Sequence, residues 1–258
     1  MTELIDTHVH LYDSDFETDI TDVVADAKGN GVSKVILPAI DSNYYERMTE
    51  LSLAFKGFAY PCLGLHPTSV KDNWRDELEF VFDNIDKHKF IAIGEIGLDG
   101  YWSKEHFSQQ IIVFEEQLRL AAERDLPVII HSRESTEEIF KVLERNRALA
   151  LRGVFHAFSG SYQTYKRIVR AGNFKIGVGG VVTYKNSKLP EILERVSTED
   201  IILETDAPWL TPVPYRGKRN QPAFVKIIAQ KVAEIKRCSL EEICSVTSSN
   251  AKNFFNLS

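Results

Sequence analysis

The sequence predicts an α/β protein: a single (β/α)8 TIM barrel that spans residues 1–258 as one domain. Short apolar runs alternate with stretches of helical character, and no linker or low-complexity segment interrupts the alternation. In addition, potential metal ligands lie at the ends of apolar runs that are far apart in the chain. Because the strands of a barrel converge, ligands of one centre must be spread over strand ends in this way.

The expected strands are short and apolar, and they lie at residues 4–7, 34–38, 59–65, 90–93, 128–130, 153–155, 174–178 and 201–203. The expected helices lie at 18–28, 43–54, 76–87, 104–124, 135–147, 161–171, 189–196 and 220–236, followed by 239–247 and an end segment at 250–255. The clearest helix is 104–124, where Phe107, Ile111, Phe114, Leu118 and Ala121 recur at helical spacing. An open doubly wound sheet is the alternative, but its single switch point cannot serve site residues on so many strands.

Composition limits the classes of protein that this chain can belong to. No apolar run approaches the roughly 18 residues of a membrane span, and the first expected strand begins too early to leave room for a signal peptide. The three cysteines show no CxxC spacing, so we expect a reduced, cytoplasmic protein. A net charge of −6 excludes a protein that wraps duplex DNA, but it permits a nucleic-acid substrate held at a metal centre and a small basic loop.

Six side chains are candidate ligands of a divalent metal: His8, His10, Glu95, His131, His156 and Asp206. His8 and His10 are two residues apart on an extended segment, so both rings face the same side. Glu95 lies between apolar residues and glycines, where an unpaired carboxylate is costly to bury. A core histidine or a turn aspartate explains any one of these residues alone. It does not explain six of them at strand ends.

These motifs resemble the TatD metal-dependent hydrolases of the amidohydrolase superfamily along essentially the whole chain. The matching stretches are 4–11 (LIDTHVHL), 64–67 (GLHP), 94–99 (GEIGLD), 127–133 (PVIIHSR), 156–160 (HAFSG), 204–212 (ETDAPWLTP) and 250–251 (NA). The resemblance implies a TIM barrel with a divalent metal site and deoxyribonuclease activity. The chain departs from the family pattern at Tyr12, where Asp or Asn is usual, at Gly100, which precedes the aromatic residue, and at Ala157, where Cys is frequent.

The resemblance also implies how the ligands are shared. One metal would take His8, His10, Glu95 and Asp206, and a second would share Glu95 and add His131 and His156. Mixed nitrogen and oxygen ligands suit zinc, manganese, nickel or iron, and we expect one to three ions. Magnesium-supported nuclease activity is implied by the resemblance alone. Asp206 is the candidate general base, and Glu204 either orients a ligand or has a structural role in the barrel interior.

Further residues are candidates for contact with substrate. His66 either contacts the scissile phosphate or only forms a hydrogen bond near the site. Arg133 either reaches a phosphate or forms a salt bridge with Glu134 or Glu137. The proline-bounded loop 214–222 holds Arg216 and Lys218, which we expect to bind phosphate, although a solvated turn is the alternative.

Tyr101 and Trp102 follow the fourth expected strand. They either stack on a base or pack as part of a lid.

We therefore expect a divalent-metal-dependent nuclease that shortens DNA from its ends, single-stranded DNA most readily. Its catalytic residues would be Asp206, Glu95 and His66, and the 3′ to 5′ direction is implied by the resemblance alone. The expected partner is weakly bound DNA, with no membrane and no obligate protein partner. The alternative is a hydrolase of a small ester, lactone or amide. The complete ligand set argues against a third reading, a binding or scaffolding protein with a vestigial site.

Overall fold

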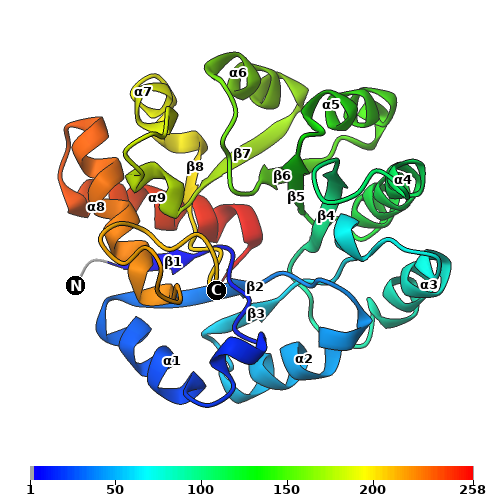
Figure 1. The fold of residues 1–258 in the computed structure, drawn as a ribbon, viewed down its shortest axis with the longest axis horizontal. Coiled ribbons are helices and arrows are strands. Elements are labelled where there is room, and N and C mark those ends of the chain that lie inside the picture. The colour runs from blue at the N-terminus through cyan, green and yellow to red at the C-terminus, as the bar shows by residue number, and fades with distance from the viewer. Residues whose placement is uncertain (1–2, 258) are drawn as a thin grey trace.

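Parallel strands form a ring, and helices form a layer around it (Figure 1). The protein is described by a computed structural model over residues 3–257. The strands are β1 (Leu4–Asp6), β2 (Val32–Leu37), β3 (Ala59–Pro61), β4 (Ile93–Asp99), β5 (Val128–Arg133), β6 (Arg152–Phe155), β7 (Asn173–Val178) and β8 (Ile201–Leu203). Strands β1 to β3 and strands β4 to β8 form two runs of neighbours in chain order.

Backbone contacts join these two runs at both ends, which closes the barrel. Between β3 and β4, Leu63 bridges Ile93, and the amide of Gly94 donates to the carbonyl of Leu63 at 2.9 Å. Between β8 and β1, the amide of Thr7 donates to the carbonyl of Leu203 at 3.0 Å, and Val9 bridges Ala207. The predicted (β/α)8 TIM barrel is therefore confirmed.

The outer helices each bury one apolar face against the strands. They are α1 (Ile20–Gly29), α2 (Tyr45–Ala54), α3 (Trp74–Asn84), α4 (Phe107–Glu123), α5 (Thr136–Arg145), α6 (Tyr162–Ala171), α7 (Leu189–Leu193), α8 (Val225–Lys236) and α9 (Leu240–Phe255). In α4 the predicted face is found: Phe114, Leu118 and Ala121 are fully buried, and Phe107 and Ile111 are partly buried. No helix in residues 3–257 has the combination of length and apolar character that crossing a bilayer requires.

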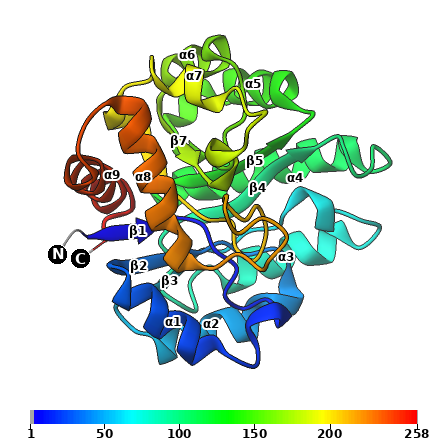
Figure 2. The same cartoon turned by 60° about the vertical axis from the view of Figure 1, so that its left-hand side comes forward.

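Helix α9 covers the amino-terminal end of the barrel, beside the start of β1 and both chain ends (Figure 2). Its residues Phe254 and Phe255 pack on apolar side chains of the strands, among them Ile129, Val154 and Ile202. These three lie two residues before His131, His156 and Glu204, and alternate residues of a strand share a face. The barrel interior is therefore apolar toward α9 and polar at the carboxyl ends of the strands.

The end of the chain differs from the expectation, because α9 is one continuous helix where two segments, 239–247 and 250–255, were predicted. Asn250, the first residue of the second expected segment, is buried in the helix. Its side-chain amide donates to the carbonyls of Thr198 and Ile201 at 2.8 Å, so its polar group is satisfied.

Strand β4 also differs from the expectation. It was predicted at 90–93 but runs from Ile93 to Asp99, so Glu95 lies within the strand instead of after it. The pairing with β5 moves from Ile93 opposite Val128 to Ile96 opposite Ile130, so β4 advances three residues while β5 advances two. Glu95 occupies this irregular stretch. The pattern of apolar residues in the sequence does not predict such a bulge.

Candidate metal centre

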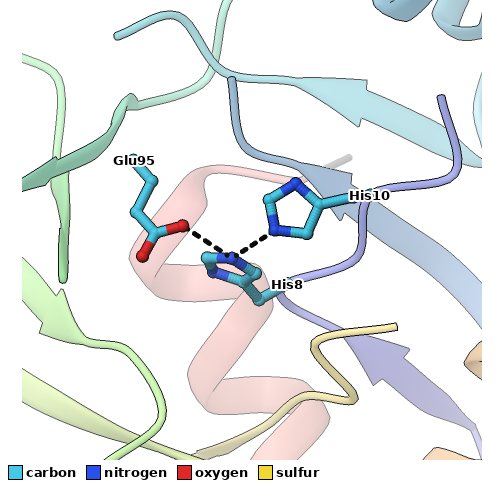
Figure 3. Close-up of side chains that lie close together, drawn as sticks. All are labelled: His8, His10 and Glu95. Atoms are coloured by element: carbon cyan, nitrogen blue, oxygen red, sulfur yellow. Dashed lines mark hydrogen bonds and ion pairs between the residues drawn. The ribbon is translucent and has the colours of Figure 1, made fainter. Parts of the chain in front are cut away.

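Seven polar side chains converge at the carboxyl ends of the strands, and they are His8, His10, His66, Glu95, His131, His156 and Asp206. All six predicted ligands are among them, and the seventh is His66. Figure 3 shows His8, His10 and Glu95 directed at one another from β4 and from the segment after β1. His8, His10 and Glu95 are at most 3% exposed.

The first group of donor atoms has the spacing of a metal site. Nε2 of His8 lies 3.1 Å from Nε2 of His10 and 3.2 Å from Oε2 of Glu95. Oδ1 of Asp206 lies 3.7 Å and 3.6 Å from the same two nitrogens. A tetrahedral ion with bonds of about 2.0–2.1 Å separates its ligand atoms by about 3.3 Å. His8, His10 and Glu95 therefore form a group that could hold a divalent ion, and Asp206 lies beside its two histidines.

A second group of donors surrounds the other oxygen of Glu95. Its Oε1 lies 2.9 Å from Nδ1 of His131, 3.5 Å from Nε2 of His66 and 3.9 Å from Nε2 of His156. One buried carboxylate thus faces two sets of donors, an arrangement suited to two ions that share it. Sequence reasoning had placed His66 outside the ligand set, and a histidine after a short apolar run carries no signal that distinguishes these roles.

Three of the histidines are oriented by a partner on their second ring nitrogen. Nδ1 of His156 lies 3.0 Å from Oε1 of Glu204, an ion-pair contact without hydrogen-bond geometry, and Nε2 of His131 forms a hydrogen bond of 2.9 Å with Oδ2 of Asp99. Nδ1 of His10 lies 2.6 Å from the hydroxyl of Tyr12. That hydroxyl donates to the carbonyl of Pro38, so its oxygen accepts from His10, which leaves Nε2 of His10 free to act as a ligand.

His8 has no such partner, because its Nδ1 is buried and forms neither a hydrogen bond nor an ion pair within residues 3–257. Its ring instead lies against the ring of His156, with centroids 3.4 Å apart and an interplanar angle of 18°. The position of His8 is therefore fixed by packing and by the backbone of the segment after β1.

The carboxylate of Glu204 is buried behind His156 and accepts from the amide of Ala157 at 2.6 Å. Gly177 on the neighbouring strand makes room for it, because a Cβ there would lie 2.1 Å from Oε2 of Glu204. Of the two roles considered for Glu204, these contacts support the orientation of a ligand.

Asp206 is held by the junction of β8 and β1. Its amide donates to the carbonyl of His8 at 2.9 Å, and its φ of 60° lies in the left-handed region that aspartate tolerates. One residue earlier, the hydroxyl of Thr205 donates to Oδ2 of Asp6 at 2.6 Å, and its amide donates to Oδ1 at 2.9 Å. These bonds fix the segment that carries His8 against the segment that carries Asp206.

The pKa values of three of these histidines shift in different directions: that of His8 is lowered, and those of His131 and His156 are raised. Burial, reinforced by the charge of His156, lowers the pKa of His8 to about 4. Burial also opposes the charged form of His131, but its bonds to Asp99 and Glu95 raise the pKa to about 9. His156 is likewise buried, yet the charges of Glu204 and Glu95 raise its pKa to about 10.

The two carboxylates at the centre stay ionised. Burial alone raises the pKa of Glu95, but the charges of His66, His156 and His8 outweigh it and hold the pKa well below its usual value. Burial also raises the pKa of Asp206, but the positive charge of His156 outweighs burial and lowers this pKa below its usual value. Both residues therefore offer negative oxygen ligands at neutral pH.

Arg133 ends β5 and is exposed, and its guanidinium lies over the ring of Tyr101, 3.7 Å from the ring centroid. The alternative of a salt bridge to Glu134 or Glu137 is not found in the described part of the chain, where Glu137 pairs with Arg167 instead.

In the loop 214–222, Arg216 and Lys218 are exposed and form no ion pair within residues 3–257. Arg219 differs, because its guanidinium bonds both carboxylate oxygens of Asp19, at 2.9 Å and 2.6 Å. The third cation of this loop therefore anchors it to the segment before α1, and two cations remain for a ligand.

Known proteins resemble this chain over its whole length. The model of the family described as TatD related DNase matches residues 5–256. The metal-dependent hydrolase YabD of Bacillus subtilis (strain 168) is 37% identical over 98% of this chain and 99% of its own length. Human deoxyribonuclease TATDN3 is 30% identical over 98% of this chain and 94% of its own length. The crystal structure of the TatD homologue YJJV from Escherichia coli K12 matches with a TM-score of 0.90 at 32% identity, covering 100% of this chain and 99% of that one.

Proposed function

This chain belongs to the TatD related DNase family and is a metal-dependent hydrolase, and from that premise we propose that it hydrolyses phosphodiester bonds at the ends of single-stranded DNA. The observation that carries the proposal is Glu95, a buried ionised carboxylate whose two oxygens face two separate sets of donors. Two ions held in this way suit the displacement at phosphorus of a nuclease. The name of the human relative TATDN3 supports DNA as substrate, and the 3′ to 5′ direction belongs to the same proposal.

We propose that His8, His10, Asp206 and one oxygen of Glu95 hold one ion, and that the other oxygen of Glu95 holds a second with His131 and His156. His66 lies on that side as well and is a further candidate donor. The mixture of imidazole and carboxylate favours zinc, manganese, nickel or iron in the resting protein, with magnesium able to support cleavage. Bound ions would polarise the phosphate and lower the pKa of the attacking water.

Asp206 is our candidate for the general base. Its side chain is 14% exposed against 4% for Glu95, so of the two carboxylates it is the one accessible to water and substrate. Its backbone bond to His8 fixes the carboxylate close to the ring nitrogens. The lowered pKa keeps Asp206 ionised and able to accept a proton from water at neutral pH. Glu95 and His66 would position the reacting groups from the barrel side of the site.

The substrate side of the proposal rests on two exposed cations. Arg216 and Lys218 lie in a loop after β8, at the end of the barrel where phosphate is commonly bound. The net charge of the chain is −6, so the protein as a whole repels nucleic acid. Few phosphates of a strand can therefore be held at once, which favours a strand end over the middle of a duplex.

A substrate panel tests the function. Wild-type protein and Asp206→Asn would be incubated, with each divalent metal and with chelator, on end-labelled single-stranded DNA, circular single-stranded DNA, simple phosphodiesters, esters and lactams. We expect stepwise shortening of the linear strand from its 3′ end, intact circles, and loss of most of the rate in Asp206→Asn. Faster turnover of esters or lactams than of DNA would favour the small-substrate alternative, for which the same barrel is also suited.

The site of action in the cell is a further part of the proposal. All three cysteines, Cys62, Cys238 and Cys244, are free thiols, which is the state expected in a reducing compartment. We therefore propose that the protein acts in the cytoplasm.

A further inference from the structure

Three side chains form an exposed cluster beside the metal centre: Tyr101 and Trp102 in the loop after β4, and Arg133 at the end of β5. We call this cluster the aromatic platform. Tyr101 is 50% exposed and Trp102 is 69% exposed, and their rings meet edge to face with centroids 5.1 Å apart. Arg133 lies 3.7 Å from the centroid of Tyr101 and 5.2 Å from that of Trp102. Rings this exposed are not packed as a lid.

The platform is fixed to the metal centre through one buried carboxylate, Asp99. Its Oδ1 accepts from the amides of Tyr101 and Trp102 at 2.9 Å and 3.0 Å. Its Oδ2 lies 2.9 Å from Nε2 of His131. Asp99 is 1% exposed, and bonds from His131 and from these amides outweigh burial and keep its pKa below the usual value. The same side chain therefore positions a candidate ligand and the backbone that carries the two rings.

Arg133 lies one step further along β5 than the candidate ligand His131. Arg133 follows His131 by two residues in β5, so the two side chains leave the strand on the same face. Two residues of a strand span about 7 Å. Gly100 brings the loop close to this strand end, because its amide donates to the carbonyl of Arg133 at 2.8 Å and a Cβ there would lie 2.8 Å from the carbonyl of Glu134.

We propose that the aromatic platform binds the nucleotide next to the scissile phosphate, with its base stacked on Trp102 and its phosphate paired with Arg133. This inference rests on the proposed nuclease function and names the part of the substrate that is read. An exposed indole offers a flat face to any base, which suits binding without sequence preference. Contact with Tyr101 pre-orders the guanidinium for an anion. A base is free to stack only where the strand is unpaired, so the platform selects single strands and frayed ends.

The first test measures binding without cleavage. A short single-stranded oligonucleotide with 2-aminopurine near its 3′ end would be titrated with protein kept in chelator, and quenching of the 2-aminopurine fluorescence would be recorded. We expect quenching with wild type and a loss of about tenfold in affinity with Trp102→Ala, the order of magnitude of one lost base–aromatic stack. Trp102→Phe should restore most of it. Phe82→Ala, which removes an exposed ring from α3, is the matched control and should bind like wild type.

The second test measures selectivity during turnover. With metal present, Trp102→Ala should lower kcat/KM about tenfold on an ordinary single strand, mainly through KM, and by less than about twofold on a strand whose terminal nucleotides are abasic. An equal loss on both strands, or no loss on either, would overturn the platform while leaving the nuclease proposal intact. Conversely, quenching by a protein that cleaves no DNA would retain the platform and refute the nuclease.

Discussion

Three of the site histidines are oriented by groups of different charge, a carboxylate for His131, a carboxylate for His156 and a neutral phenol for His10. A carboxylate partner strengthens both the orientation and the basicity of a ligating imidazole, whereas a phenol supplies orientation with little charge. Tyr12 stands at a position where the family pattern has Asp or Asn. This exchange makes His10 the candidate ligand whose orientation is set with the least help from charge.

Tyr12→Phe tests that dependence. The ring stays in its fully buried position, but the hydroxyl that accepts from Nδ1 of His10 is lost. We expect metal affinity to fall by about tenfold, the lower range for loss of a partner behind a ligand. The measurement is a titration with manganese or zinc against a competing chelator. Tyr162→Phe, on α6, is the matched control, and an unchanged affinity in Tyr12→Phe would show that the hydroxyl does not position the ligand.

Proton release should accompany metal binding. His131 and His156 have pKa values of about 9 and 10 in the metal-free protein, so both are protonated at pH 7.5 and must lose a proton before they can bind an ion. We expect release of about two protons at pH 7.5 and an affinity that rises with pH up to about 10. Calorimetry in buffers of different ionisation enthalpy measures this number. Heats that are independent of the buffer would contradict it.

The same shifts act on the stability of the metal-free protein. Both folded-state pKa values lie above the unfolded value of about 6.5. The contribution of these ion pairs is therefore complete below about pH 6.5 and is lost as pH rises through the folded-state values.

Residue identity alone predicted much of this site. The HxH spacing and the placement at strand ends identified six side chains, and the structure brings all six together. The contact of Asp99 with His131 was not foreseen, and His66 was expected near the site but outside the ligand set, because both positions depend on strand register. The bulge at Glu95 decides which oxygen faces which donors, and periodicity does not encode it.

At the scale of elements, the junction of β8 with β1 holds Asp206, the more exposed of the two candidate carboxylate ligands. Thr205→Val removes the hydroxyl that bonds Oδ2 of Asp6 and accepts from the amide of Ala207. Both groups are buried, so we expect the free energy of unfolding to fall by about 1–3 kcal/mol. Chemical denaturation measures this change, and Thr205→Ser, which keeps a hydroxyl, should recover most of it. A loss of less than about 0.5 kcal/mol would show that the junction does not depend on this bond.

The cations of the loop after β8 have different expected roles: Arg216 is a candidate for binding substrate, and Arg219 holds the loop in place. Arg216→Ala removes an exposed guanidinium that lies 4.3 Å from the ring centroid of Tyr184, and it should slow DNA cleavage several-fold with little change in melting temperature. Arg219→Ala breaks the two bonds to Asp19 and should instead lower the melting temperature. Unchanged cleavage by a folded Arg216→Ala would refute the phosphate role.

The boundaries of helices and strands were predicted well where the pattern of apolar residues alone determines them. Helix α4 and strands β5 to β8 show clear apolar patterns, and they lie close to the expected ranges. Strand β4 and helix α9 differ because tertiary contacts determine them. Pairing with β5 extends β4 beyond its apolar run, and burial satisfies the polar side chain of Asn250 inside α9.

At the scale of the whole molecule, the two ends of the barrel have different tasks. Helix α9 and the apolar strand side chains that pack on it close the amino-terminal end of the barrel. The interior between α9 and the candidate metal centre is therefore apolar. The carboxyl ends of the strands carry the candidate ligands, the aromatic platform and the basic loop. Ligands from strands at opposite sides of the ring can meet only if the barrel is closed. Closure between β8 and β1 and between β3 and β4 is therefore a requirement of the site as well as of the fold.

If the histidine–carboxylate cluster is the metal centre, hydrolysis must depend on the ions that it binds. The most direct measurement is to strip the protein with chelator, add back manganese or zinc in steps, and follow bound metal and cleavage of end-labelled single-stranded DNA in the same samples. We predict that cleavage rises in proportion to bound metal in wild type and stays near the stripped level in Asp206→Asn and His8→Ala. Full cleavage by stripped protein, or metal binding that is unchanged in His8→Ala, would show that hydrolysis does not use a metal bound by this cluster.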